Sequence, residues 1–539
     1  MESFAVLSPL LSFLLVGLLG KRIGDRASGV LTVLAGAFSF AISLYSAAKA
    51  IKDPFTVKLY EFITLGPYTL HLGLYFDALS SITACIVTFV ATLIFLYSIG
   101  YMENLFGQWV FKFYSYLSLF LFAMLLIVLS DNLLGIFFGW EGVGLASYLL
   151  IGYFHNQKKA SDASLEAFVM NRIGDWLFIF GIILSFYLFG SLYLLDIFHQ
   201  APKADPHLLG LAALLLFGGA VGKSGQFPLH TWLPNAMAGP TPVSALLHAA
   251  TMVAAGVYMV SRLYPVFELS PESLKVVALV GGITALFAAL AATSHTDIKK
   301  IIAFSTMSQL GLMYLALGIG DKAGAMFHLS THAFFKALLF LSAGSVITAF
   351  HHHVYDIYET GGLRSYMPLT YVSFFVGALA LSGIFPLSGF FSKDRIISSS
   401  YEHSIALGVL ASLVSFLTAY YIFREGFVMF HGGGSFKEHH MEPHESKPIM
   451  TVPMIILAFL SVVAGGFEGW YFGLFDAHKE LHMSVAILSV SIALGGIGLA
   501  YLLFGKGQRR LEIILFREQF FTERFYHRVM AWGYVKVSK

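Results

Sequence analysis

Ionisable side chains occur inside several long apolar segments of this sequence. Glu141 lies at the centre of the run GIFFGWEGVGLASYLLIGYF, and Lys223 lies in an apolar run that Gly225 and Pro228 interrupt soon afterwards. A lysine in hydrocarbon costs roughly 2.5–3.5 kcal/mol on insertion scales, so such residues usually face a bundle interior or water. A carboxylate at the same depth must be protonated or paired. The pattern indicates groups that bind and release protons. The alternatives are a structural glutamate and a lysine that snorkels to the interface.

A second group of titratable residues follows a four-residue step. His328, His332 and Lys336 occur within AMFHLSTHAFFKALLFLSAG, so they form one polar stripe on an otherwise apolar helix. Imidazole titrates near neutral pH, which favours proton transfer. A metal site is the weaker interpretation, because HxxxH without a carboxylate or cysteine is a poor zinc signal. His248 is a candidate bridge between Lys223 and this stripe, or a core histidine.

Two charged pairs complete the set of candidate residues. Arg172 and Asp175 are three apart, so they share a helix face and can pair, either as a structural pair or to tune the proton affinity of Glu141. Lys393 and Asp394 are adjacent within FPLSGFFSKDRI, and we expect either that Lys393 transfers protons while Asp394 tunes its proton affinity, or that the two form an ion pair at a helix end.

These residues must be positioned by membrane-spanning helices. The chain has 539 residues, of which 57% are hydrophobic and only 12% charged, against about 25% charged in a soluble domain. Its apolar runs of about 18–25 residues are long enough to cross a bilayer of about 30 Å. We therefore predict an all-α polytopic membrane protein with about 15 transmembrane helices. The net charge of +2 and the absence of a basic tract give no indication of nucleic-acid binding.

The expected helices lie near residues 4–20, 29–50, 76–101, 112–130, 132–154, 164–189, 208–238, 242–263, 275–293, 297–319, 322–350, 368–402, 404–431, 451–472 and 483–505. A polar stretch at 52–74 is expected to form a hairpin-like element. The histidines of the loop 431–447 are expected to be solvated rather than to bind zinc. The cluster 351–353 is expected to be an interfacial loop or a surface proton-exchange site.

A short motif divides the chain into two halves. The sequence GQFPL at 225–229 recurs as GIFPL at 383–387, and each copy sits at a break in an apolar helix with a lysine nearby. Interrupted helices at matching places in two halves point to a transport site. Five helices separate the breaks, and an odd number of crossings inverts one half relative to the other. The predicted units are residues 1–111 (N-terminal helices and hairpin), 112–263 (first repeat), 264–431 (second repeat), 432–505 (C-terminal helices) and 506–539 (amphipathic tail).

Basic residues fall mainly in alternate loops, which indicates an orientation. The positive-inside rule places the N-terminus outside and the C-terminal tail inside. The residues on which this rests are Lys21, Arg22, Arg26, Lys158, Lys159, Lys299, Lys300, Arg424, Lys506, Arg509 and Arg510. The sequence has no dinucleotide fingerprint, no P-loop and only one cysteine, so any energy for transport must come from a partner or an ion gradient.

Three segments carry a family resemblance: FFGWEGVGLASYLLIGYF, GKSGQFPLHTWLPNAMAGPTPVSALLHAATMV and FHLSTHAFFKALLFLSAGSV. They closely resemble the family of antiporter-like subunits L of the proton-pumping NADH:quinone oxidoreductase, respiratory complex I. The likeness extends from about residue 60 to 505. A weaker one reaches subunits of multi-subunit sodium/proton antiporters and the membrane partner of inorganic-carbon uptake systems.

The resemblance implies two inverted five-helix repeats, each with a broken helix, and a chain of buried charges across the membrane. Glu141 and Lys223 match the family's Glu–Lys pair, and Lys336 its central lysine. The other matches are His328 and His332 beside Lys336, Lys393 as the terminal lysine, and Arg172 with Asp175 beside the glutamate. The family continues into a long lateral helix and a final anchor. The tail 507–539 stops before that helix, so we expect a shortened connection.

The expected function is therefore that of a proton-translocating subunit in a bacterial cytoplasmic membrane. The chain would act as part of an NADH:quinone oxidoreductase without redox chemistry of its own. The resemblance implies no cofactor in this chain, and NADH, FMN, iron–sulfur clusters and quinone in partner subunits. The implied partners are other membrane subunits and the lipid bilayer, with protons or sodium as the ion. The alternatives are a cation/proton antiporter subunit and a membrane partner of inorganic-carbon uptake.

Overall fold

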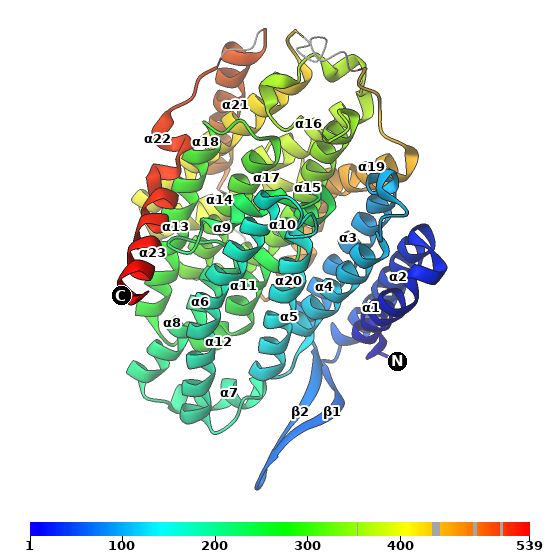
Figure 1. Cartoon of the computed structure of the whole chain (residues 1–539). Coiled ribbons are helices and arrows are strands. Elements are labelled where there is room, and N and C mark those ends of the chain that lie inside the picture. The colour runs from blue at the N-terminus through cyan, green and yellow to red at the C-terminus, as the bar shows by residue number, and fades with distance from the viewer. Residues whose placement is uncertain (353, 434–441, 478–481, 507–509, 539) are drawn as a thin grey trace.

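The computed structural model describes residues 1–352, 354–433, 442–477, 482–506 and 510–538, and it is a bundle of long helices (Figure 1). Within these residues, 14 helices are long and apolar enough to cross a membrane. The expected polytopic helical membrane protein is confirmed. The helix expected at 368–402 is divided by the second break into α16 (Pro368–Ser382), a shorter apolar helix, and α17 (Ser388–His403).

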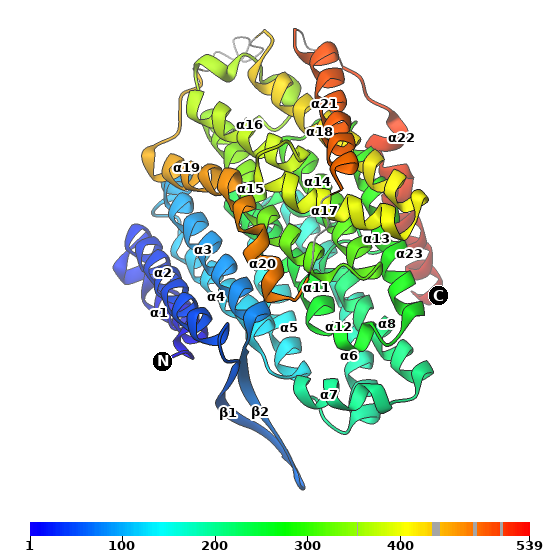
Figure 2. The same ribbon diagram turned by 180° about the vertical axis from the view of Figure 1, so that it is seen from behind.

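The N-terminal part contains three membrane helices and one hairpin: α1 (Phe4–Ile23), α2 (Asp25–Ala50), β1 (Phe55–Leu65), β2 (Tyr68–Phe76) and α3 (Ala78–Tyr101). The polar stretch expected to be hairpin-like forms the antiparallel pair β1–β2, which extends away from the helices (Figures 1 and 2). Its strands are rich in Thr, Tyr and Phe, which favour strands. Gly66 starts the turn with φ of +60°, a conformation that glycine adopts without steric cost.

The first half contains α4 (Phe111–Leu129), α5 (Leu133–Ile151), α6 (Lys158–Phe189), α7 (Leu194–Gln200), α8 (Pro206–Lys223), α9 (Trp232–Asn235), α10 (Thr241–Ala249), α11 (Met252–Arg262) and α12 (Tyr264–Phe267). The predicted break is present between α8 and α9. A second interruption was not predicted. The stretch expected to be one helix at 242–263 is divided at Ala250 and Thr251, beside His248, although neither residue is glycine or proline.

The second half contains α13 (Pro271–Ala292), α14 (Ile298–Gly318), α15 (Lys322–Ala349), α16, α17 and α18 (Ile405–Phe430). The long helix α15 is continuous through His328, His332 and Lys336. Its membrane-spanning window is 89% buried, compared with 33% for α1. The titratable stripe therefore lies in the centre of the bundle rather than at its lipid-facing edge.

The C-terminal part contains α19 (Pro448–Val463), α20 (Glu468–Leu474), α21 (Met483–Phe504), α22 (Ile514–Arg517) and α23 (Thr522–Ser538). After α21 the tail runs back along the side of the bundle, beside α13 and α8 (Figures 1 and 2). The Tyr526 hydroxyl donates to the Pro228 carbonyl at 2.7 Å, and Thr522 lies 3.1 Å from a ring nitrogen of His230. The tail thus covers the first break. His353 and most of the histidine-rich loop lie outside the described residues.

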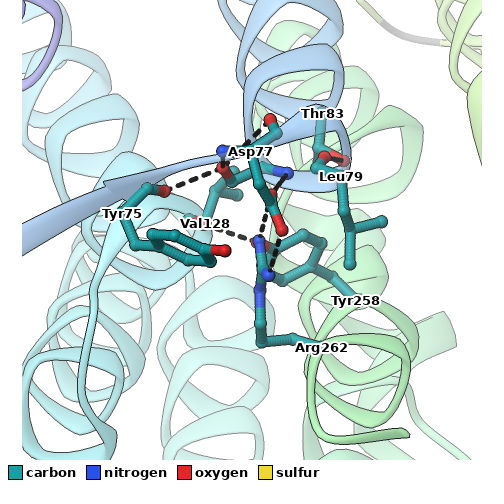
Figure 3. Close-up of polar contacts among 8 residues, drawn as sticks. Tyr75, Asp77, Leu79, Thr83, Val128, Tyr258 and Arg262 are labelled. Carbon is teal, nitrogen blue, oxygen red and sulfur yellow. Dashed lines mark hydrogen bonds and ion pairs between the residues drawn. The ribbon is translucent and has the colours of Figure 1, made fainter. Parts of the chain in front are cut away.

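An ion pair joins the N-terminal part to the first half. Two guanidinium nitrogens of Arg262, at the end of α11, each donate to Asp77 at 2.7 Å, and Asp77 caps α3 (Figure 3). Burial raises the pKa of Asp77, but the hydrogen bonds from Arg262 and Ser80 outweigh this effect and hold the pKa below its usual value. This pair fixes the base of the hairpin against the bundle.

Candidate functional site

Lys223 is the last residue of α8 and is fully buried. Its ammonium nitrogen lies 3.8 Å from a carboxylate oxygen of Asp175 on α6. On the other side it faces α5, where a Cβ atom added to Gly144 would lie 3.1 Å from the nitrogen. The absence of a side chain at Gly144 therefore gives the ammonium its place between α5 and α6.

Glu141 pairs with Arg172 rather than with Lys223. A guanidinium nitrogen of Arg172 lies 2.7 Å from a Glu141 oxygen, and the two side chains are 39% and 25% exposed. The expected intrahelical pairing of Arg172 with Asp175 is therefore wrong, because each residue pairs with a different helix. Both acids and Arg172 line one cavity of about 380 Å³ between α5 and α6. Two acids and two bases from α5, α6 and α8 are thus gathered at one place.

His248 occupies the end of α10 next to the unpredicted interruption. Its ring is fully buried, and neither ring nitrogen has a hydrogen-bond partner among the described residues. The ring lies 4.9 Å from that of Phe340 on α15, centroid to centroid. His248 therefore contacts the helix that carries the titratable stripe. No hydrogen bond within the described part of the chain joins it to Lys223.

The stripe on α15 faces two other helices. The Lys336 ammonium donates to the hydroxyl of Ser305 and, at 3.4 Å, to the carbonyl of Ile302, both on α14. The rings of His332 and His328 lie 6.1 Å apart, centroid to centroid. The sequence therefore predicted the shared face correctly, and α14 supplies the polar groups opposite Lys336.

Hydrogen bonds continue from His328 toward the second break. One ring nitrogen lies 2.9 Å from the side-chain oxygen of Gln309 on α14, and the other lies 2.8 Å from the hydroxyl of Ser392 on α17. The next residue along α17 is Lys393. The stripe is therefore connected to the immediate neighbour of the terminal lysine.

The side chain of Lys393, on α17, reaches across the break to α16. It is buried, and its ammonium donates to the carbonyl of Leu381 at 3.2 Å. This carbonyl belongs to the last turn of α16, whose final carbonyls lack helical partners, and a lysine commonly satisfies such groups. Asp394 is also buried and accepts from Ser489 on α21 at 3.4 Å. The adjacent Lys393 and Asp394 thus face different helices and are not an exposed helix-end pair.

Three further buried charges were not singled out as site residues. Lys299, at the start of α14, donates to the Gly239 carbonyl at 2.7 Å. Arg424 on α18 donates to the His295 carbonyl at 2.7 Å, and Glu425 beside it is fully buried. From the sequence, Lys299 and Arg424 were used only to predict the orientation of the chain in the membrane. The signal that identified Glu141, a charge within an apolar run, is also present at Glu425.

Interrupted helices and buried lysines, one of them beside an acid, are combined here as in an antiporter-like membrane subunit. The family model described as "NADH:quinone oxidoreductase/Mrp antiporter, TM" matches residues 130–418, more than half of the chain. A second model, "NADH-Ubiquinone oxidoreductase (complex I), chain 5 N-terminus", matches residues 62–112.

Curated relatives narrow this class to one family. The chain is 43% identical to NADH-quinone oxidoreductase subunit L of Pseudomonas aeruginosa, over 98% of this chain and 87% of the relative. It is 38% identical to subunit L of Neisseria meningitidis serogroup A, over 98% and 88%. The chain belongs to the NADH-quinone oxidoreductase subunit L family.

Solved structures agree with this fold. A chain of the Mrp complex from Dietzia matches with a TM-score of 0.81 at 24% identity, over 100% of this chain and 60% of that chain. A chain of an archaeal membrane-bound sulfane sulfur reductase matches with a TM-score of 0.77 at 22% identity, over 92% and 99%. The fold of this chain is therefore shared with chains of both complexes.

Proposed function

We propose that this chain is a proton-translocating membrane subunit of a quinone-reducing respiratory complex. The observation that carries the proposal is the succession of buried acid and base groups through both halves of the bundle. Ionisable groups inside a membrane protein mark ion paths when they face the bundle interior. We call Lys223, His248, His332, Lys336 and Lys393 the relay residues, and we call Asp175, which pairs with Lys223, and Glu141, which pairs with Arg172, the acidic residues of the site.

The chemistry of the relay follows from the acidic residues of the site. The charged form of Lys223 is stabilised by a carboxylate nearby and loses that stabilisation if the carboxylate pairs elsewhere. Glu141 already pairs with Arg172, so a competing pair is present beside Lys223. A change of partner would release a proton from Lys223 toward His248 and then to His332 and Lys336. Lys393 would receive it last, at the second break.

The energy for this step comes from other chains. The relatives are named as subunits of NADH-quinone oxidoreductase, and on that basis we propose that NADH, FMN, iron–sulfur clusters and quinone act in partner subunits. The lysine-bearing loops favour an orientation with the N-terminus outside and the tail inside. The direction of transfer would then be from the inside toward the exit near Lys393.

The proposal is tested in inverted membrane vesicles that contain the assembled complex. Lys223→Ala is expected to reduce proton uptake per NADH oxidised while the complex still assembles. Lys275→Ala is the matched control, because Lys275 is an exposed lysine paired with Glu272 at the start of α13. Unchanged proton uptake in Lys223→Ala would overturn the scheme. Sodium-driven proton exchange without NADH would instead indicate a cation/proton antiporter.

A further inference from the structure

Glu425 is a buried carboxylate that the relay described above does not use. It lies near the end of α18, its side chain is fully buried, and neither of its oxygens has a hydrogen-bond partner among the described residues. A buried carboxylate without hydrogen bonds is costly when ionised, so it takes up a proton or lies near a positive charge. The neighbouring Arg424 donates instead to the His295 carbonyl and, at 3.2 Å, to the hydroxyl of Tyr358.

Glu425 and Lys336 lie near the same end of α14, although they belong to α18 and α15. Lys336 donates to Ser305 and Ile302 in the first turns of α14, which begins at Ile298. Arg424, the residue before Glu425, donates to the His295 carbonyl just before that helix. Lys336 and Glu425 are therefore a base and an acid within one buried region.

Glu425 belongs to a polar face of α18 that lines this region. Thr418 and Tyr421 precede it by seven and four residues, so the three side chains share one face of the helix. The Thr418 hydroxyl accepts from Gln309 at 3.4 Å and from Tyr421 at 3.5 Å. Gln309 is the residue that holds His328. The polar face of α18 therefore adjoins the same hydrogen-bonded groups as the stripe on α15.

The position of Glu425 along α18 indicates whether it lies on the inner or the outer side of Lys336 in the membrane. Thr418 lies toward the middle of α18, whereas Arg424 reaches the loop between α13 and α14 through the His295 carbonyl. That loop precedes Lys299 and Lys300, which the positive-inside rule places inside. Glu425 thus lies between Lys336 and the inner face, opposite to the direction in which Ser392 and Lys393 lead from the stripe.

We propose that Glu425 is a further proton carrier that loads Lys336 from the inner side. The inference rests on the proposed function and deepens it. In the step, the O–H bond of the neutral Glu425 acid breaks and an N–H bond forms on the neutral Lys336 amine. This leaves a carboxylate beside an ammonium. The carboxylate then takes a proton from the inner aqueous side, and the ammonium passes its proton onward toward Lys393.

The test replaces Glu425 in the assembled complex and measures NADH-driven proton uptake in inverted vesicles. Glu425→Gln keeps the shape but cannot carry a proton, and proton transfer into Lys336 is expected to slow by about 100-fold, the lower end of what a positioned donor contributes. Proton uptake per NADH falls accordingly, and Glu425→Asp retains part of it. Glu402→Gln, on the exposed end of α17, is the control and is expected to behave as wild type.

A spectroscopic readout separates proton carrying from a purely structural role. Wild-type complex is expected to show an infrared band of a protonated carboxylic acid that changes on turnover, and this band disappears in Glu425→Gln but not in Glu402→Gln. Wild-type uptake in Glu425→Gln with a strong defect in Lys223→Ala would overturn the role of Glu425 and leave the proposed function intact. If Glu425→Gln does not assemble, the absence from the wild-type complex of a protonated carboxylic acid band that changes on turnover overturns the proposal.

Discussion

Lys223 and Asp175 lie 3.8 Å apart although they belong to different helices, α8 and α6. Asp175 was expected to pair with Arg172 of its own helix, yet Arg172 pairs across to Glu141 on α5. Two acids and two bases therefore form two ion pairs, with Lys223 buried and Arg172 partly exposed, and both acids and Arg172 line one cavity. This arrangement allows either base to lose or gain an acidic neighbour when one of the helices moves.

Asp175→Asn tests the importance of this pair. The substitution removes the negative charge and keeps the shape, so the ammonium of Lys223 loses its nearest carboxylate. A loss of about 1.4 kcal/mol changes a protonation equilibrium tenfold. We expect proton uptake per NADH to fall in vesicles, with the amount of assembled complex unchanged. Asp175→Glu restores the charge and serves as the control, and equal uptake in wild type and Asp175→Asn would contradict the pairing.

Substitutions of Gly144 distinguish an effect on the position of the Lys223 ammonium from an effect on protein stability. A methyl group at this position would lie 3.1 Å from the Lys223 nitrogen, which is closer than ordinary van der Waals contact. Alanine stabilises a helix relative to glycine by about 0.8–1 kcal/mol. Gly144→Ala is therefore expected to lower proton uptake slightly without lowering thermal stability, and Gly144→Val to lower uptake further. A substitution that reduces stability and uptake together would indicate a packing defect.

Asp77→Asn is expected to destabilise the protein in a pH-dependent way. The pKa of Asp77 is held below its usual value of about 3.9, so its ionised form stabilises the fold above that pH and the effect is lost as the pH falls through the folded-state pKa. Leaving Arg262 without its partner at pH 7 costs about 3 kcal/mol. Thermal unfolding of the purified protein is expected to show a lower midpoint for the variant at pH 7.

The pH dependence provides the control for this prediction. The difference between wild type and Asp77→Asn is expected to narrow as the pH is lowered toward and below about 4, because Asp77 becomes protonated in the wild type. A constant difference over that range would mean that the carboxylate charge is not what stabilises the base of the hairpin.

The sequence predicted the membrane helices, the hairpin and the two broken helices because these depend on local composition. Long apolar runs, strand-forming residues and the repeated FPL motif are visible without any partner. The burial of Lys223, Lys336 and Lys393 was also predictable, because a charge within an apolar run has few other places to lie.

The pairing of charges was not predictable from spacing, because it depends on how α5, α6 and α8 rotate against one another. The interruption beside His248 was missed since Ala250 and Thr251 carry no helix-breaking signal; tertiary packing overrides propensity there. Glu425 was missed because Arg424 beside it suggested an interfacial helix end. The course of the tail over the first break depends on long-range contacts that no local pattern specifies.

The partial exposure of Arg172 and Glu141 has a consequence for the subunit on its own. Around them α6 presents Ile173 and Trp176 to the outside, so the ion pair is set into a surface suited to acyl chains. Lipid tails cannot hydrogen-bond a guanidinium, whereas a neighbouring protein chain can. A copy of the subunit without a neighbouring chain would therefore be less stable in the bilayer. Docking of a neighbour at Arg172 and Glu141 would remove this destabilisation close to the ion pair of Lys223 with Asp175. Assembly of the subunit and proton transport would then depend on the same small patch of surface around Arg172 and Glu141.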